Sequence, residues 1–226
     1  MRAAIYLAAK DLKVELRSKE MLSAMFLFSL LMVLAFRFAF KDSVTAGVVS
    51  LDDLAPAALW ICFSFAAILG MHTAFAKEKD RETLDGLLLC PVERSVLFVG
   101  KTISSFAVVF IVDLLTILFF SLFFSYDYGG HALEILAIAL IGTVTLVLIG
   151  TLVAAVSVNT RAREVLLPVL LIPLIAFSVI IPCVTATGNA IAGDLSESVR
   201  DIVSIAGFAV VFAVVGYLTF DYLLEG

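Results

Sequence analysis

KEKDRETLDGLLLCPVERSVLFVGK, residues 77–101, is a long stretch rich in both charge signs, and it separates two apolar stretches that are each long enough to cross a membrane. Within it, Leu84, Leu87 and Leu88 recur at helical spacing, which predicts a short helix with one apolar and one charged face. Pro91 would end this helix, because proline cannot continue the backbone hydrogen-bond ladder. We expect this coupling segment to lie at the membrane surface and to pass force from a soluble partner to the spans. Its candidate contact residues are Glu78, Asp80, Arg81, Glu82, Leu84, Leu87, Leu88 and Pro91.

The composition predicts a protein whose solvent is lipid. Of the 226 residues, 62% are hydrophobic and only 15% are charged, and the mean hydropathy is +1.13. A soluble domain carries roughly 25% charged residues, so this chain cannot cover its surface with polar groups. The net charge of −5 says little about binding partners, because charges on opposite sides of a bilayer do not act as one field. We expect no nucleic-acid partner.

Apolar runs of membrane-spanning length predict an all-α membrane protein with six transmembrane helices. Helices are expected because every backbone polar group in lipid needs an internal partner. A span of 19 residues rises about 28 Å, close to the hydrocarbon thickness. The single predicted domain, 1–226, contains an interfacial helix at 3–20, a coupling loop at 77–101, and spans at about 22–40, 54–76, 103–126, 132–158, 165–184 and 202–224.

The N-terminal stretch is amphipathic. Its apolar face is predicted to hold Ile5, Ala9, Leu12 and Leu16, and its basic face Lys10, Lys13 and Arg17. This pattern is typical of a helix that lies flat at the interface with its basic side toward anionic headgroups. A plain charged tail is the alternative.

Several features predict details of the later spans. Trp60 is expected near the outer end of the second span, where an amphipathic ring prefers the interface. Three prolines in the fifth span, the last of them Pro182, predict kinks or a broken helix. Residues 185–201 predict a polar outer loop, in which Asp194 and Glu197 resemble the capping pair of a short surface helix.

The basic residues predict the orientation. If the N-terminus is cytoplasmic, all but three of the 15 lysines and arginines fall on the inner side. This asymmetry places both termini and the coupling loop in the cytoplasm. The three on the outer side are Arg37, Lys41 and Arg200.

One carboxyl group lies deep in a span. Asp113 is about ten residues into the third span, where a carboxylate is costly unless it is protonated, paired or hydrated. It is either a polar contact in a translocation path or at a subunit interface, or a protonated acid or one hydrogen-bonded to a nearby Thr or Ser. Gly142, Thr143 and Thr145 predict close packing and interhelical hydrogen bonds in the fourth span.

Other motifs point to no catalytic or cofactor site. Gly100-Lys101-Thr102 resembles the end of a phosphate-binding loop, but Ser95 stands where the first glycine is required. His72 and His131 lie at opposite ends of the spans, so they cannot form one bis-histidine site. The three cysteines form no redox or haem-attachment motif. We therefore predict no catalytic residue, no metal site and no cofactor bound by this chain.

The order and spacing of these parts resemble the permease of an ABC-2 type exporter, and within that group the haem exporter protein B (CcmB) family of cytochrome c maturation. The resemblance covers nearly the whole chain. It rests on Lys10–Arg17 (KDLKVELR), Glu82–Pro91 (ETLDGLLLCP), Gly100-Lys101, Gly142–Thr145 (GTVT), Arg161 and Val165–Pro173 (VLLPVLLIP).

The resemblance implies a transport subunit of the bacterial cytoplasmic membrane that is not itself an enzyme. Two copies would pair with two copies of a CcmA-like ABC ATPase, which docks on Glu78–Pro91, and with CcmC-like and CcmD-like membrane proteins that handle haem. ATP hydrolysis in the partner would drive export of haem or release of a haem-loaded chaperone. The alternatives are an ABC-2 permease for a drug, lipid or glycan, a structural anchor without a path, and a membrane-embedded enzyme.

Overall fold

The computed structural model describes residues 2–80, 94–158 and 163–223, and these are helical almost throughout. Six of the described helical segments are long and apolar enough to cross a membrane, which confirms the prediction of an all-α membrane protein. The helices, in order, are α1 (Arg2–Ser18), α2 (Glu20–Thr45), α3 (Leu51–Asp80), α5 (Arg94–Phe124), the short η1 (Gly129–His131), α6 (Ala132–Val158), α7 (Arg163–Ile175), η2 (Ala176–Ile180), α8 (Ile181–Ile191) and α9 (Leu195–Leu223).

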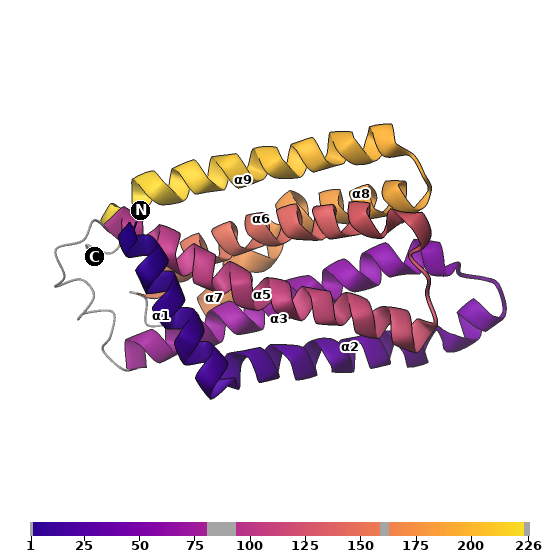
Figure 1. Cartoon of the computed structure of the whole chain (residues 1–226), viewed down its shortest axis with the longest axis horizontal. Helices are drawn as coiled ribbons and strands as arrows, with labels where there is room; N and C mark the ends of the chain where they lie inside the picture. Colours follow the sequence, from indigo (N-terminus) through magenta and orange to yellow (C-terminus); the bar gives the residue numbers. More distant parts are fainter. Residues whose placement is uncertain (1, 81–93, 159–162, 224–226) are drawn as a thin grey trace.

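The long helices run side by side, and α1 lies across one end of the bundle (Figure 1). Of the six spans, those of α3 and α6 are the most buried, whereas α9 lies at the periphery and buries little of its surface. The beginning of α1 and the end of α9 lie at the same end of the bundle (Figure 1). The α3–α6 pair therefore forms the centre around which the other helices pack.

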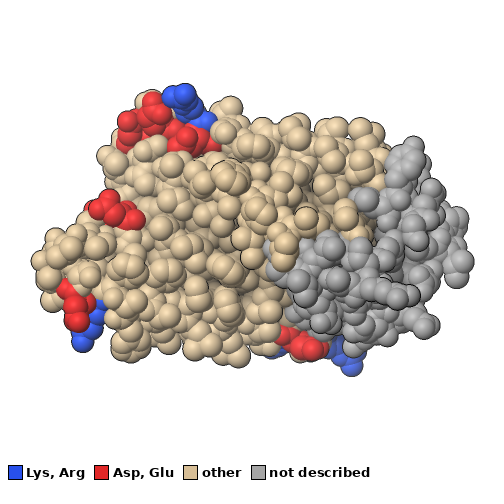
Figure 2. All heavy atoms as spheres, turned by 180° about the vertical axis from the view of Figure 1, so that it is seen from behind, with Lys and Arg blue, Asp and Glu red and all other residues tan. Residues whose placement is uncertain are grey.

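On the surface of the bundle, the described charged side chains lie toward its ends. On the face shown in Figure 2, the described acidic and basic residues gather toward the two ends, with a broad uncharged belt between them. A belt without charges is what a bilayer core requires, since an uncompensated charge there is costly. The distribution agrees with spans that run along the long axis of the bundle.

The fifth span departs from its predicted bounds. Helix continues from α7 through η2 into α8, as far as Ile191. The segment η2 is a π-helix, in which the Ile181 N–H donates to the Ala176 carbonyl. Pro182 explains why the π-helix occurs at this point. Proline lacks the N–H that would otherwise donate to the Ser178 carbonyl, and its ring crowds that carbonyl. The predicted interruption is thus a wider helical turn within a continuous helix.

The predicted outer loop at 185–201 is wrong. Residues 185–191 belong to α8, and the connection to α9 is short, with Gly193 at a φ of +78°. The polar side chains that indicated a loop are satisfied within helices: the Thr187 hydroxyl donates to the Cys183 carbonyl at 2.7 Å. Across the turn, the Asn189 side-chain amide donates to Asp201 Oδ2 at 3.0 Å.

The predicted cap at Asp194 exists, but it begins a long helix and not a short one. The Glu197 N–H donates to Asp194 Oδ1 at 3.3 Å, and the Ser196 hydroxyl donates to the same oxygen at 2.9 Å. These bonds lower the pKa of the Asp194 carboxyl, because they favour its charged form. The helix that follows is α9, which is itself the sixth span.

Candidate functional site: the α1–α5 contact and the buried carboxyl of Asp113

The coupling segment falls mostly outside the described residues. Glu78 and Asp80 belong by their backbone to the last turn of α3. The other predicted contact residues, Arg81, Glu82, Leu84, Leu87, Leu88 and Pro91, lie outside the residues that the structure describes, as does Cys90. The described helices flank the segment, since α3 ends at Asp80 and α5 begins at Arg94.

Helix α5 packs against α1 directly after this segment. A Cβ at Gly100 would lie 2.8 Å from the side chain of Leu7 and 3.1 Å from the carbonyl of Ala4, so the two backbones approach as closely as only glycine permits. The surface of α1 that faces the bundle includes Ala4 and Ala8, whose side chains are buried. Small residues on both helices thus bring α1 into intimate contact with the beginning of α5.

A buried ion pair lies in the same contact. Lys101 Nζ of α5 is 2.9 Å from Asp11 Oδ2 of α1, and the Lys101 side chain is only 10% exposed. A buried ammonium needs such a partner, because burial disfavours its charged form. From the sequence, Gly100 and Lys101 were expected only to precede the third span. A glycine followed directly by a basic residue was the feature that could have indicated this contact with α1.

The face of α1 that contacts the bundle is neither of the two faces predicted from the sequence. The predicted apolar face stays exposed at Ile5 and Leu16, and the bundle contact is made by a third face that includes Ala4, Ala8 and Asp11. Helix α1 lies across the end of the bundle (Figure 1), and Ile5 and Leu16 on it are exposed, which is the geometry that an interfacial helix requires. Its position at a membrane surface stays a prediction.

Asp113 lies in the interior of the bundle, and its side chain is 1% exposed. Its Oδ2 is 2.7 Å from Thr143 Oγ1 on α6, and Oδ1 contacts no hydrogen-bond donor among the described residues. The structure therefore matches the expectation of a carboxyl group bonded to a neighbouring threonine. It also confirms at Thr143 the interhelical hydrogen bond that was predicted for the fourth span.

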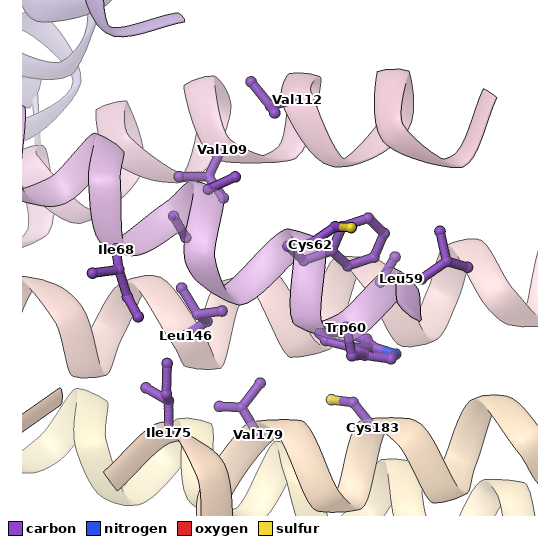
Figure 3. Packing of buried hydrophobic residues seen from close by; sticks show 14 of the residues in the cluster. Leu59, Trp60, Cys62, Ile68, Val109, Val112, Leu146, Ile175, Val179 and Cys183 are labelled. Atoms are coloured by element: carbon purple, nitrogen blue, oxygen red, sulfur yellow. The ribbon is translucent and has the colours of Figure 1, made fainter. Parts of the chain in front are cut away.

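The expectation that Trp60 sits at the membrane interface is wrong. Its ring is buried between α3, α6 and α8, close to Cys183 (Figure 3). The indole Nε1–H donates to Thr187 Oγ1 at 2.9 Å. A Cβ at Gly142 would lie 2.1 Å from the ring, so the missing side chain of this glycine makes the space that the indole fills. Sequence position near the end of a span could not reveal a hydrogen-bond partner on α8.

Aromatic and charged residues join the helices at the end of the bundle opposite α1. The Tyr126 hydroxyl donates to Asp52 Oδ1 at 2.8 Å, and burial together with the nearby carboxylate raises the pKa of Tyr126. The Arg37 guanidinium lies 5.6 Å from the centroid of the Phe124 ring, within range of a cation–π contact. His131 Nδ1 lies 3.5 Å from Glu134 Oε2.

Metal-binding clusters of His, Cys, Asp and Glu are absent from the described residues. Cys62 and Cys183 are free and buried. The side chain of His72 lies outside those that the structure describes.

Residues 2–223 match the protein-family model described as CcmB protein. No protein with curated annotation matches the chain.

Proposed function

Since this chain belongs to the CcmB family, we propose that it is the permease subunit through which a separate ABC ATPase drives haem export, or release of a haem-loaded chaperone, in c-type cytochrome maturation. CcmB proteins are permease subunits of ABC transporters in haem export and cytochrome c biogenesis, and they work with an ABC ATPase and other maturation proteins. The chain is a multi-pass membrane protein.

The coupling proposal rests on the close contact between α1 and α5. We place the docking site of the ATPase on Glu78–Pro91, between the end of α3 at Asp80 and the beginning of α5 at Arg94. A displacement of this segment would act on α5 within two turns of Gly100 and Lys101, where α5 is held to α1. Helices α1 and α5 would then move as one body relative to the central α3–α6 pair.

The assembly proposed around the chain follows the family. It comprises a second copy of the chain, a CcmA-like ATPase, CcmC-like and CcmD-like membrane proteins, and the lipid bilayer, with haem held by the partners and ATP by the ATPase. The location is the bacterial cytoplasmic membrane, with both termini cytoplasmic. The arrangement of both chain ends at the end of the bundle where α1 lies supports a common side for the termini (Figure 1).

Reversing the three acidic charges at Glu78, Asp80 and Glu82 to lysine tests the docking site. We expect loss of ATPase co-purification and of cytochrome c maturation, with normal amounts of folded permease in the membrane, because the proposed role of these charges is to contact the partner ATPase. A control with lysine at the exposed α1 positions Ala3, Tyr6 and Ser18 adds three cations at the same end of the bundle. Normal maturation by the Glu78/Asp80/Glu82 variant would exclude the segment as the coupling contact.

Co-purification tests the cargo. The proposed role predicts that the chain, isolated with its ATPase, brings a haem-handling maturation protein with it. A complex that contains the ATPase alone, and whose ATP hydrolysis responds to a drug, lipid or glycan, would instead establish an exporter of another cargo.

A further inference from the structure

In the part of the chain that the structure describes, no lysine or arginine forms an ion pair with Asp113. Along α5, the Cα atom of Asp113 is about 18 Å from that of Lys101 and about 17 Å from that of Phe124. The Arg37 guanidinium lies against the Phe124 ring, 5.6 Å from its centroid. The helices packed against α5 over its membrane-spanning length are α2, α3, α6 and α9. Their lysines and arginines lie near their ends, and α6 has none. The titratable group that faces Asp113 in the described interior is the Cys62 thiol, which cannot supply a positive charge.

The donors available to Asp113 are too few for a carboxylate. Buried anions are stabilised by several hydrogen bonds or by a paired charge, and an uncompensated buried ion is strongly disfavoured. Asp113 has one hydroxyl within reach, on Thr143, and its Oδ1 has no partner among the described residues. A neutral carboxylic acid needs less, because its hydroxyl requires one acceptor and an unpaired carbonyl oxygen is less costly to bury than an uncompensated charge.

The geometry around Thr143 also indicates where the proton is. Thr143 Oγ1 lies 2.6 Å from the Ala139 carbonyl on its own helix and 2.7 Å from Asp113 Oδ2. A threonine hydroxyl has one proton to donate. If that proton goes to the Ala139 carbonyl, as is common for threonine in helices, the contact with Asp113 needs a second proton, and only a protonated Asp113 supplies it.

The same pattern of hydrogen bonds occurs between Trp60 and Thr187, where only the indole N–H of Trp60 can be the interhelical donor. Thr187 Oγ1 lies 2.7 Å from the Cys183 carbonyl, four residues earlier, and receives the indole N–H of Trp60 at 2.9 Å. There, a donor from a neighbouring helix bonds a threonine that donates back to its own helix. A protonated Asp113 reproduces this pattern at Thr143, with an O–H in the place of the indole N–H.

We propose that Asp113 is an intramembrane proton-binding site: in this conformation it is a neutral carboxylic acid that donates a hydrogen bond to Thr143. The ligand is a proton, held by burial between α5 and α6 and by the threonine oxygen. The proton can leave as an ion only when these helices separate enough to admit water or a cation. The proposal does not depend on the cargo or on the ATPase.

Infrared spectroscopy of the purified, membrane-reconstituted protein at neutral pH tests this assignment. We expect a carbonyl-stretching band of a protonated carboxylic acid that shifts in D₂O and is lost in Asp113→Asn. Asp52→Asn is the matched control, because Asp52 is an acceptor of the Tyr126 hydroxyl at the end of the bundle, and its removal should leave the band in place. The absence of a protonated-acid band, or its survival in Asp113→Asn, would overturn the proposal.

Thr143→Val gives a second, independent measurement that does not remove the carboxyl group. Loss of the acceptor should weaken the hydrogen bond and move the carbonyl band to higher frequency, whereas an ionised Asp113 would give no such band to move. Asp113→Lys should abolish the folded protein in the membrane, because it buries an unpaired cation, while Asp113→Asn should keep it, because the amide can donate to Thr143. Equal loss of folded protein in both variants would contradict a neutral donor at this position.

Discussion

Single side chains determine how closely the helices of this bundle approach one another. Gly142 on α6 leaves the space that Trp60 occupies, and Gly150, two turns later, does the same for Met71, since a Cβ there would lie 1.9 Å from the methionine sulfur. Both large residues come from α3 and are almost fully buried. The central α3–α6 contact therefore depends on matched pairs of a glycine and a large side chain.

Gly142→Ala should destabilise the protein by about 1–3 kcal/mol, the usual cost of overpacking a filled core. The added methyl group would meet both the Trp60 ring and Cys183 Sγ, and neither belongs to a flexible chain end that could move aside. Thermal unfolding followed by tryptophan fluorescence would report the site directly, because Trp60 is the sole tryptophan.

Gly207→Ala is the control for this substitution. Gly207 lies within helix α9, and a Cβ there would have no described atom within 4 Å. The expected change is neutral, or a gain of up to about 1 kcal/mol from helix propensity. Equal destabilisation by both alanines would show that packing on Trp60 is not the cause.

The Tyr126–Asp52 hydrogen bond predicts a loss of stability in alkali. The pKa of Tyr126 is raised in the folded protein, so the neutral phenol is favoured by folding. The contribution of this group to the free energy of unfolding is complete below the ordinary tyrosine pKa of about 10. It is lost as the pH rises above that value toward the pKa of Tyr126 in the folded protein. Tyr126→Phe should unfold more readily at neutral pH and should lose less stability between neutral pH and alkali than the wild type. Tyr6→Phe, at an exposed position of α1, serves as the control.

Among the helices, the α1–α5 contact offers a charge-swap test of the joint proposed for coupling. Asp11→Lys or Lys101→Asp alone leaves two like charges in a mostly buried contact and should cost about 3–5 kcal/mol, enough to detach α1 and stop maturation. The double variant restores opposite charges and should recover part of the stability and activity. The measurement is a double-mutant cycle on both quantities. Additive losses in the double variant would show that the two residues act independently.

The fifth span continues as a helix beyond its predicted end, which shows that polar residues are a poor guide to where a span ends. Thr187, Asn189 and Ser198 made residues 185–201 look like a loop, yet each finds a partner within α8, on α9, or between the two. A hydroxyl that donates to a carbonyl of its own helix costs little in lipid, so polarity alone does not mark the membrane boundary.

For the bundle as a whole, the strongest prediction concerns its orientation. The basic residues predict that the N-terminus and the C-terminus are on the cytoplasmic side, and the beginning of α1 and the end of α9 lie at the same end of the bundle (Figure 1). Reporter fusions that are active only in the cytoplasm should therefore be active at both termini and inactive after Asp127, between α5 and α6. Activity at one terminus alone would refute the orientation and the accessibility of the coupling segment to an ATPase.

Length and hydrophobicity along the chain were enough to predict six helical spans, because these local properties govern insertion into lipid. The order of the weak motifs was enough to indicate the family. The partners of the polar groups could be learned only from the packed bundle: Asp11 with Lys101, Thr143 with Asp113, and Trp60 with Thr187. These pairs join residues far apart in the chain, and in lipid a polar group takes whichever partner packing brings within reach, which no local pattern specifies.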